Sequence, residues 1–206
     1  MLYYGQLHLP ERMEERFAQS LRAFSTAIEL RFPNHTGLTE DVVTFARTLG
    51  RKMNLSPARL KRMEKACRLR DIGLCAIPYR LVNSRSYGTW TSAEQATYDR
   101  HPEVSGAMLE LVPSLRSLAN IVRLHHAAYD GSSWPGSPAG REIPIESRII
   151  KVAVEYVWLS RWEGSRAALE SIRARAGAAY DPAVAEVLER VLTSSHVEER
   201  SARMVL

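Results

Sequence analysis

The 206-residue sequence has little cysteine, no long apolar run and no pattern typical of an export signal. Its two cysteines, Cys67 and Cys75, are too few for a disulfide framework or for a zinc site built on cysteine. No apolar stretch approaches the roughly 18 residues that a membrane-spanning helix needs, so we expect no membrane partner. The start of the chain lacks a basic segment followed by an apolar core, which favours a cytoplasmic location.

Strong charge of one sign is also missing, because 28 lysines and arginines face 23 acidic residues for a net charge of +5. A basic balance of this size admits nucleic acids, nucleotides and anionic membranes without selecting among them. The excess is spread in mixed patches, which favours a solvated basic surface, and DNA is not expected as a partner. The content of 45% hydrophobic and 25% charged residues is that of a globular domain.

Alternation at period two, the pattern of a half-buried strand, is missing as well, and helical periodicity runs through nearly the whole chain. The fold class predicted is all-α, a multi-helix bundle. The leading helix is expected from Pro10 to Arg31, with one face formed by Met13, Phe17, Leu21, Phe24 and Ile28. Further helices are expected over Thr39–Met53, from Pro57 to about Asp71, after Thr91, and over Pro102–Leu111, Ser114–Ala128, Pro144–Leu159, Ser165–Ala176 and Asp181–Leu192.

Several helix ends carry local signals. Ser56 and Asp181 each precede a proline, which is typical of an N-cap followed by the first helical residue. Thr91 and Glu94 have the spacing of a capping box, and Gly177 is a plausible C-terminal stop. The segment 130–140 is rich in turn-forming residues and contains Trp134, which we interpret either as a packed aromatic or as the lip of a pocket.

Four histidines have positions that suit metal binding, because neutral imidazole is a common ligand for transition metals. His35 and His101 are each expected where a helix begins, and His125 and His126 are adjacent on the helix expected over Ser114–Ala128. By spacing alone the signal is weak, since a lone histidine on a helix is more often structural.

The order of the motifs along the chain is more specific. It consists of Asn34-His35-Thr36, Arg70-Asp71-Ile72-Gly73-Leu74, Ile77-Pro78, His101-Pro102-Glu103, His125-His126, Asp130-Gly131-Ser132-Ser133-Trp134-Pro135 and Arg148-Ile149-Ile150. From about residue 23 to residue 192 this order resembles the HD-GYP family, a bacterial branch of the HD-domain metal-dependent phosphohydrolases. The resemblance implies a helical domain that binds two or three ions, often iron or manganese, and hydrolyses cyclic di-GMP. It also implies a division into a leading helical segment at 1–31, the HD-GYP-like domain at 32–195 and a tail at 196–206.

The chain departs from the family pattern at positions that matter for catalysis. Arg70 replaces the histidine of the His-Asp pair, Leu74 replaces a lysine soon after it, and Ala127 replaces an acidic residue after the two adjacent histidines. Ser133-Trp134 stands in place of the Gly-Tyr of Gly-Tyr-Pro, Val154 in place of a late aspartate, and Arg31 in place of an early acidic residue. The resemblance implies that one ion site keeps only His35 and Asp71. It implies that the neighbouring ion site keeps all of its ligands, Asp71, His101, His125 and His126.

Three further residues are candidates for ligand binding. Arg70 either points inward or turns to solvent. If it points inward, its guanidinium can replace the missing cation, pair with Asp71 or hold a phosphate. Trp134 either stacks on a guanine base or packs at the loop. Arg148 follows that loop and either meets a phosphate or is solvated, and Arg141 is a weaker case of the same kind.

We therefore expect a catalytically impaired HD-GYP-like domain that acts as a regulatory or binding module in cyclic di-GMP signalling. Its expected cofactor is at most one divalent ion, with iron or manganese favoured over zinc or nickel. A cyclic dinucleotide and a signalling protein are its candidate partners, and the sequence leaves the oligomeric state open. One alternative is an active phosphodiesterase with a mononuclear or rearranged metal site, and another is a scaffold that binds neither metal nor nucleotide.

Overall fold

The computed structural model describes the backbone of residues 2–32, 36–79, 81 and 87–203, and the side chains of residues 12–32, 36–79, 81 and 87–194. Its helices are α1 (Leu2–Glu29), α2 (Leu38–Lys52), α3 (Pro57–Leu69), η1 (Ile72–Ala76), η2 (Tyr87–Thr89), α5 (Ser92–Asp99), α6 (His101–Glu110), η3 (Arg116–Leu118), α7 (Ala119–Arg123), η4 (Gly140–Glu142), α8 (Ile145–Trp162), α9 (Ser165–Ala174) and α10 (Pro182–Arg203). The described residues contain no strand, only an isolated bridge between Ala176 and Tyr180, which confirms the all-α class.

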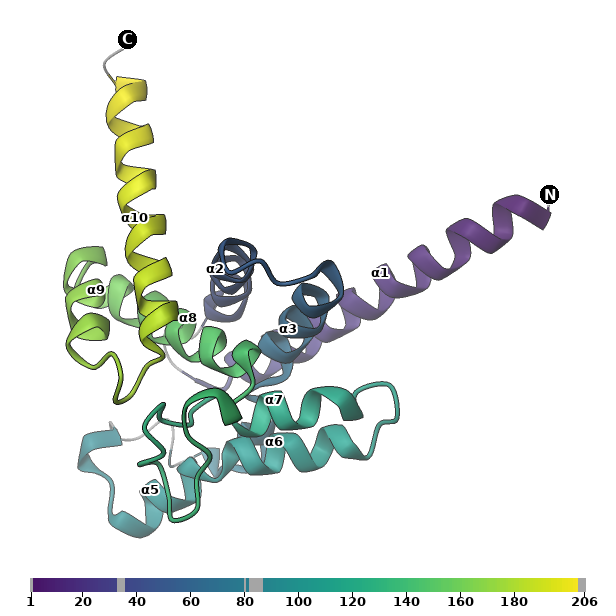
Figure 1. Cartoon of the computed structure of the whole chain (residues 1–206). Coiled ribbons are helices and arrows are strands. Elements are labelled where there is room, and N and C mark those ends of the chain that lie inside the picture. The colour runs from purple at the N-terminus through teal and green to yellow at the C-terminus, as the bar shows by residue number, and fades with distance from the viewer. Residues whose placement is uncertain (1, 33–35, 80, 82–86, 204–206) are drawn as a thin grey trace.

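The centre of the bundle is formed by α2, α3 and α8 (Figure 1). Helices α6 and α7 pack against each other below this centre, and α9 packs against α8. Helix α1 runs past α3, and its N-terminal end extends away from the bundle, as does the C-terminal end of α10 (Figure 1). No helix in the described ranges has the length and apolar character needed to span a membrane.

The main core lies where α2 faces α8. Val42, Ala46 and Leu49 of α2 are fully buried, as their helical spacing predicts. Phe45 of the same helix is half-buried and stacks on Tyr156 of α8 with 4.5 Å between ring centroids. A smaller apolar cluster of Phe32, Leu74, Ile77, Leu81 and Trp90 fixes the segment after α3.

The predicted helix-end signals are confirmed. The Ser56 hydroxyl accepts a hydrogen bond from the Arg59 amide, and Thr91 and Glu94 form the capping box in both directions. The Asp181 carboxylate accepts a hydrogen bond from the Ala183 amide at the start of α10. Gly177, soon after α9, has the left-handed φ of 86° that suits a glycine stop.

The expected start of the leading helix at Pro10 is wrong. Helix α1 begins at Leu2 and continues through Pro10, although a proline inside a helix removes one backbone hydrogen bond. On its apolar face Leu21 is buried, whereas Met13 is 66% and Phe24 is 58% exposed. The apolar spacing is helical along this face, but α3 covers only part of it.

The single helix expected over Ser114–Ala128 is also wrong. The segment forms η3, the short α7 and then a series of turns that contains His125 and His126. The Val122 carbonyl accepts hydrogen bonds from both the amide and the Nδ1 of His125. In a continued helix this carbonyl would accept from the amide of residue 126, so the His125 side chain favours the turn.

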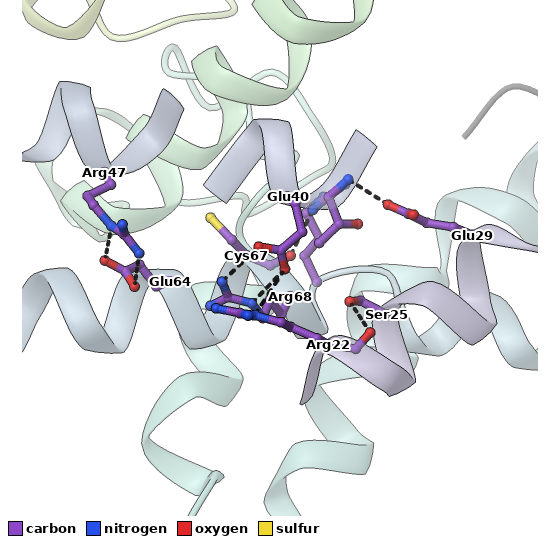
Figure 2. Close-up of polar contacts among 10 residues, drawn as sticks. Arg22, Ser25, Glu29, Glu40, Arg47, Glu64, Cys67 and Arg68 are labelled. Carbon is purple, nitrogen blue, oxygen red and sulfur yellow. Dashed lines mark hydrogen bonds and ion pairs between the residues drawn. The ribbon is translucent and has the colours of Figure 1, made fainter. Parts of the chain in front are cut away.

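Ion pairs join the helices around the core. Arg68 of α3 donates two hydrogen bonds to Glu40 of α2, and Arg47 of α2 donates two to Glu64 of α3 (Figure 2). Arg22 of α1 lies 3.9 Å from the same Glu40 carboxylate (Figure 2). These contacts fix α3, whose C-terminal end leads directly into the candidate site.

On the far side of α3, Glu146 of α8 is fully buried and accepts hydrogen bonds from Arg59 and Arg62. Burial opposes the ionisation of Glu146, but hydrogen bonds from these two arginines lower its pKa from the ordinary 4.5 to about 2. The carboxylate therefore ties α8 to the first half of α3.

Candidate metal centre

Asp71 occupies the turn between α3 and η1, and a glycine two residues later allows this turn to pack closely on α6. A Cβ atom at Gly73 would lie 2.3 Å from the His101 carbonyl oxygen and 2.7 Å from the Ser105 amide nitrogen. The Gly73 amide donates a hydrogen bond to the Ser105 hydroxyl, which in turn donates one to the Arg70 carbonyl. The absence of a side chain at residue 73 therefore places Asp71 beside the start of α6.

His101 is the first residue of α6 and is 2% exposed. Its Nδ1 lies 2.8 Å from the Tyr98 carbonyl oxygen. Since a carbonyl only accepts, Nδ1 carries the proton, and in the neutral ring Nε2 carries a lone pair. That Nε2 lies 3.5 Å from Oδ1 of Asp71.

His125 repeats this arrangement from the turn after α7. It is 1% exposed, its Nδ1 lies 2.6 Å from the Val122 carbonyl oxygen, and its Nε2 lies 3.7 Å from the same Oδ1 of Asp71. Burial lowers the pKa of His125 below its ordinary value, although the nearby Asp71 carboxylate opposes this effect. The neutral ring, with its lone pair directed toward Asp71, is therefore favoured.

The adjacent His126 is exposed and completes the cluster. The turn that carries it is held by Lys151 of α8, whose ammonium group donates hydrogen bonds to the carbonyls of His126 and Ala127 at 3.0 and 2.9 Å. Burial lowers the pKa of Lys151 to about 8. The lysine was not identified from the sequence, because only the fold brings α8 beside this turn.

Ligand atoms from Asp71, His101, His125 and His126 all lie within 4.8 Å of one another. Among the described residues, neither Nε2 of His101 nor Nε2 of His125 has a hydrogen-bond partner. Buried lone pairs directed at a carboxylate are unfavourable unless a cation lies between them. Backbone carbonyls that orient the other ring nitrogen are usual around metal-bound histidines. The donors therefore fit one transition-metal ion, and they are the four residues that the sequence predicted.

Arg70 points inward, which resolves the two alternatives left by the sequence. Its side chain is 2% exposed, Nη2 lies 3.0 Å from Oδ2 of Asp71, and Nη1 donates a hydrogen bond to the Cys67 carbonyl at 2.7 Å. Shielding from solvent opposes the ionisation of Asp71, but the adjacent Arg70 guanidinium favours it, and the Asp71 pKa lies well below its ordinary value. A fixed positive charge therefore compensates one oxygen of Asp71, while the other oxygen faces the histidines.

A cavity of about 250 Å³ opens beside the cluster and is lined by Leu38, Arg70, Asp71, Leu74, Tyr98, His126, Val154, Glu155 and Trp158. We call it the site cavity. Leu74 and Val154 stand where the family resemblance implies a lysine and an aspartate. Both line the site cavity, and both are apolar. The cavity thus lacks an ammonium group and a carboxylate at these two positions.

Two of the predicted ligand-binding residues lie elsewhere. Trp134 is 43% exposed in its loop and does not line the site cavity. Arg148 donates hydrogen bonds to the Asp181 carboxylate and, at 2.9 Å, to the Ile143 carbonyl, so its guanidinium supports the start of α10. His35 lies outside the described residues. Arg31, where the resemblance implies an acidic residue, donates to the carbonyls of Cys75 and Ile77.

The site cavity also contains residues that the sequence analysis missed. Glu155 and Trp158 follow Val154 by one and four positions on α8, so the three share one side of the helix. Since Val154 was already recognised as a site position, helical spacing offered a signal for both. Tyr98 had no comparable signal, because its position depends on how α5 packs.

Comparison with known proteins identifies the family of this chain. The family model described as "HD domain" matches residues 22–184, so the chain belongs to the HD domain family. The cyclic di-GMP phosphodiesterase response regulator RpfG of Xanthomonas campestris is 29% identical over 86% of this chain and 49% of its own length. The 3'3'-cGAMP-specific phosphodiesterase 3 of Vibrio cholerae is 25% identical over 80% of this chain and 35% of its own.

Two solved structures share the fold. A cyclic GMP-AMP-specific phosphodiesterase of V. cholerae (V-cGAP3) has a TM-score of 0.68 at 18% identity and covers 84% of this chain and 48% of its own. The HDG"Y"P protein Bd1817 of Bdellovibrio bacteriovorus has a TM-score of 0.62 at 17% identity, with coverages of 79% and 53%. The family match and the curated relatives, together with this shared fold, confirm the predicted resemblance to HD-GYP proteins. The chain spans about half or less of the length of these relatives.

Proposed function

We propose that this chain is a catalytically impaired HD-GYP-like domain that binds a cyclic dinucleotide or a signalling protein and holds at most one divalent ion. The observation that carries the proposal is the buried Arg70 guanidinium, which lies 3.0 Å from Asp71 within the site. A guanidinium keeps its positive charge at any physiological pH, so it disfavours a second ion beside the same carboxylate. We expect cyclic di-GMP hydrolysis to be weak or absent.

One ion would be held by Asp71, His101, His125 and His126, with iron or manganese favoured over zinc or nickel. When bound, such an ion lowers the pKa of a coordinated water and polarises a phosphate oxygen. The protein's own contribution is orientation, since the Tyr98 and Val122 carbonyls fix the two buried rings and Lys151 fixes the turn. Leu74 and Val154 neither donate a hydrogen bond to a phosphate nor accept a proton, and this supports the loss of catalysis.

The alternative is an active phosphodiesterase with a mononuclear or rearranged site, acting on cyclic di-GMP or another nucleotide. The intact four-residue cluster favours it, because all four ligand atoms already converge. The relatives named as phosphodiesterases of cyclic di-GMP and 3'3'-cGAMP make these two compounds the substrates to test.

The deciding experiment measures metal content per chain and the hydrolysis of both cyclic dinucleotides in manganese or ferrous iron. We expect about one equivalent in the wild type and in a control, Glu103→Gln, which alters an exposed carboxylate two residues after His101 that pairs with Arg123 and lies outside the cluster. His126→Ala should lose the metal. Two equivalents, or turnover at the rate of the relatives, would favour the enzyme. No metal after loading would remove the mononuclear site and the enzyme with it, and ligand and partner binding would then test the regulatory role.

The domain division expected from the sequence remains a proposal. Helix α10 continues without a break across the expected boundary at residues 195 and 196. The family match begins inside α1, at residue 22. A cytoplasmic location and a signalling-protein partner are likewise part of the proposal.

A further inference from the structure

One side of α8 forms a wall of the site cavity whose residues the metal cluster does not explain. Val154, Glu155 and Trp158 contribute an aliphatic group, a carboxylate and an indole. The same cavity is bounded by the guanidinium of Arg70 and by the cluster residues Asp71 and His126. With an ion held by the cluster, this lining suits a ligand that combines an apolar, flat part with a negatively charged part.

A nucleotide has this combination of groups. Aromatic side chains stack on the faces of bases, and guanidinium groups and metal centres bind phosphates. The volume of about 250 Å³ lies just below the range of about 300–1,000 Å³ that is usual for small-molecule pockets. We conclude that the site cavity has room for one nucleotide unit, and that the second half of a cyclic dinucleotide would lie outside it.

The acidic residue on this wall distinguishes among bases. Glu155 Oε1 accepts a hydrogen bond from Arg175 at 2.6 Å, which orients the carboxylate. A carboxylate has about four acceptor sites, so Glu155 retains capacity for further donors. Guanine presents two adjacent N–H donors on its Watson–Crick edge, whereas adenine presents only its amino group there.

From this juxtaposition we infer that Trp158 and Glu155 form a base subsite for a guanine nucleotide, with Trp158 stacking on the base and Glu155 accepting its two N–H groups. The inference rests on the proposed binding function and specifies its ligand class. Trp158 thereby takes the base-stacking role expected of Trp134 from the sequence, because Trp134 lies in an exposed loop outside the cavity.

The test is a titration of the manganese-loaded protein with guanosine 5'-monophosphate, adenosine 5'-monophosphate and cyclic di-GMP. Binding is measured by calorimetry and by tryptophan fluorescence. We expect guanosine monophosphate to bind about 10-fold more tightly than adenosine monophosphate and to quench fluorescence. Trp158→Ala should weaken binding by about 5- to 100-fold, the effect of losing one base-stacking aromatic. Glu155→Gln should bring the two mononucleotides to within about 3-fold of each other.

Two further variants keep the test independent of damage to the core, because Trp158 is partly packed against it. Trp158→Phe retains a ring, so binding should persist in calorimetry while most of the quenching disappears. Trp162→Phe changes the same residue type one turn further along α8, at a position 57% exposed and outside the cavity lining, and should retain both binding and quenching. Melting temperatures check that each variant is folded.

The outcomes separate this inference from the proposed function. If the wild type binds guanine nucleotides and the folded Trp158→Ala variant binds them equally well, the subsite is wrong and the binding function stands. If Trp134→Phe, rather than Trp158→Phe, removes the quenching, the loop residue contacts the base and the subsite is again wrong. If the metal-loaded wild type binds none of the three nucleotides, the subsite and the nucleotide-binding role both fail, while the metal count still tests the cluster.

Discussion

Replacing Arg70 by methionine tests the idea that its guanidinium stands in for a cation beside Asp71. Methionine retains an unbranched, flexible side chain and removes the charge. In the wild type the Asp71 carboxylate is compensated by Nη2 of Arg70 at 3.0 Å. In Arg70→Met without metal, Asp71 would lack this partner and would still face the lone pairs of His101 and His125.

The magnitude follows from the burial of the pair. Breaking a buried ion pair by removing one partner costs about 3–5 kcal/mol, and we take about 2–3 kcal/mol because the Asp71 side chain is 26% exposed. For a chain of this length 1 kcal/mol corresponds to about 2–4 °C, so the melting temperature in chelator should fall by roughly 5–10 °C. Manganese at 100 times the dissociation constant of Arg70→Met should stabilise this variant by about 2.7 kcal/mol, and a protein that binds manganese more weakly gains less at the same concentration.

The assay is thermal unfolding in chelator and in manganese for the wild type, Arg70→Met and Arg68→Met. Arg68 is a matched control, because it is a buried arginine two residues away that pairs with Glu40 outside the metal cluster. Arg68→Met should lose stability without an increased response to manganese. The reasoning is refuted if Arg70→Met is as stable as the wild type in chelator, or if manganese stabilises both variants equally.

Three other predictions concern the surroundings of the site. The Glu146 pKa is lowered to about 2, so its ionised carboxylate should add about 2–3 kcal/mol to the free energy of unfolding, a value discounted because the two arginines are half-exposed. This contribution should be present above pH 4.5 and lost as the pH falls toward 2. Urea unfolding of Glu146→Gln should show this loss already at pH 7 and a flatter pH dependence, whereas an unchanged profile would contradict the assignment. Lys151→Met should release the turn that carries His126 and so lower manganese affinity about 10- to 100-fold in equilibrium dialysis. An unaltered affinity would show that the turn keeps its conformation without Lys151. Gly73→Ala should destabilise the protein by about 2–4 kcal/mol and reduce its metal content, since the added methyl would meet the His101 carbonyl, and a variant with wild-type melting and metal content would count against this close approach.

Much of the helical framework could be predicted because its signals are local. The apolar spacing of α2, the caps at Ser56, Thr91 and Asp181, and the absence of strands depend on residues within a few positions of one another. The failures occur where a distant contact prevails over the local pattern. His125 ends α7 early through its bond to a backbone carbonyl, and α3 covers only part of the apolar face of α1.

The sequence by itself determined the all-α class through its helical periodicity, and the family and the identity of the four clustered residues through the order of motifs along the chain. Only the tertiary structure decided that Arg70 turns inward to Asp71, that Arg148 is engaged by Asp181, and that the wall of the site cavity carries Trp158 rather than Trp134. The physical reason is that a side chain's direction depends on which distant surfaces pack against its element. Those contacts form between helices far apart in the chain, so no local spacing encodes them.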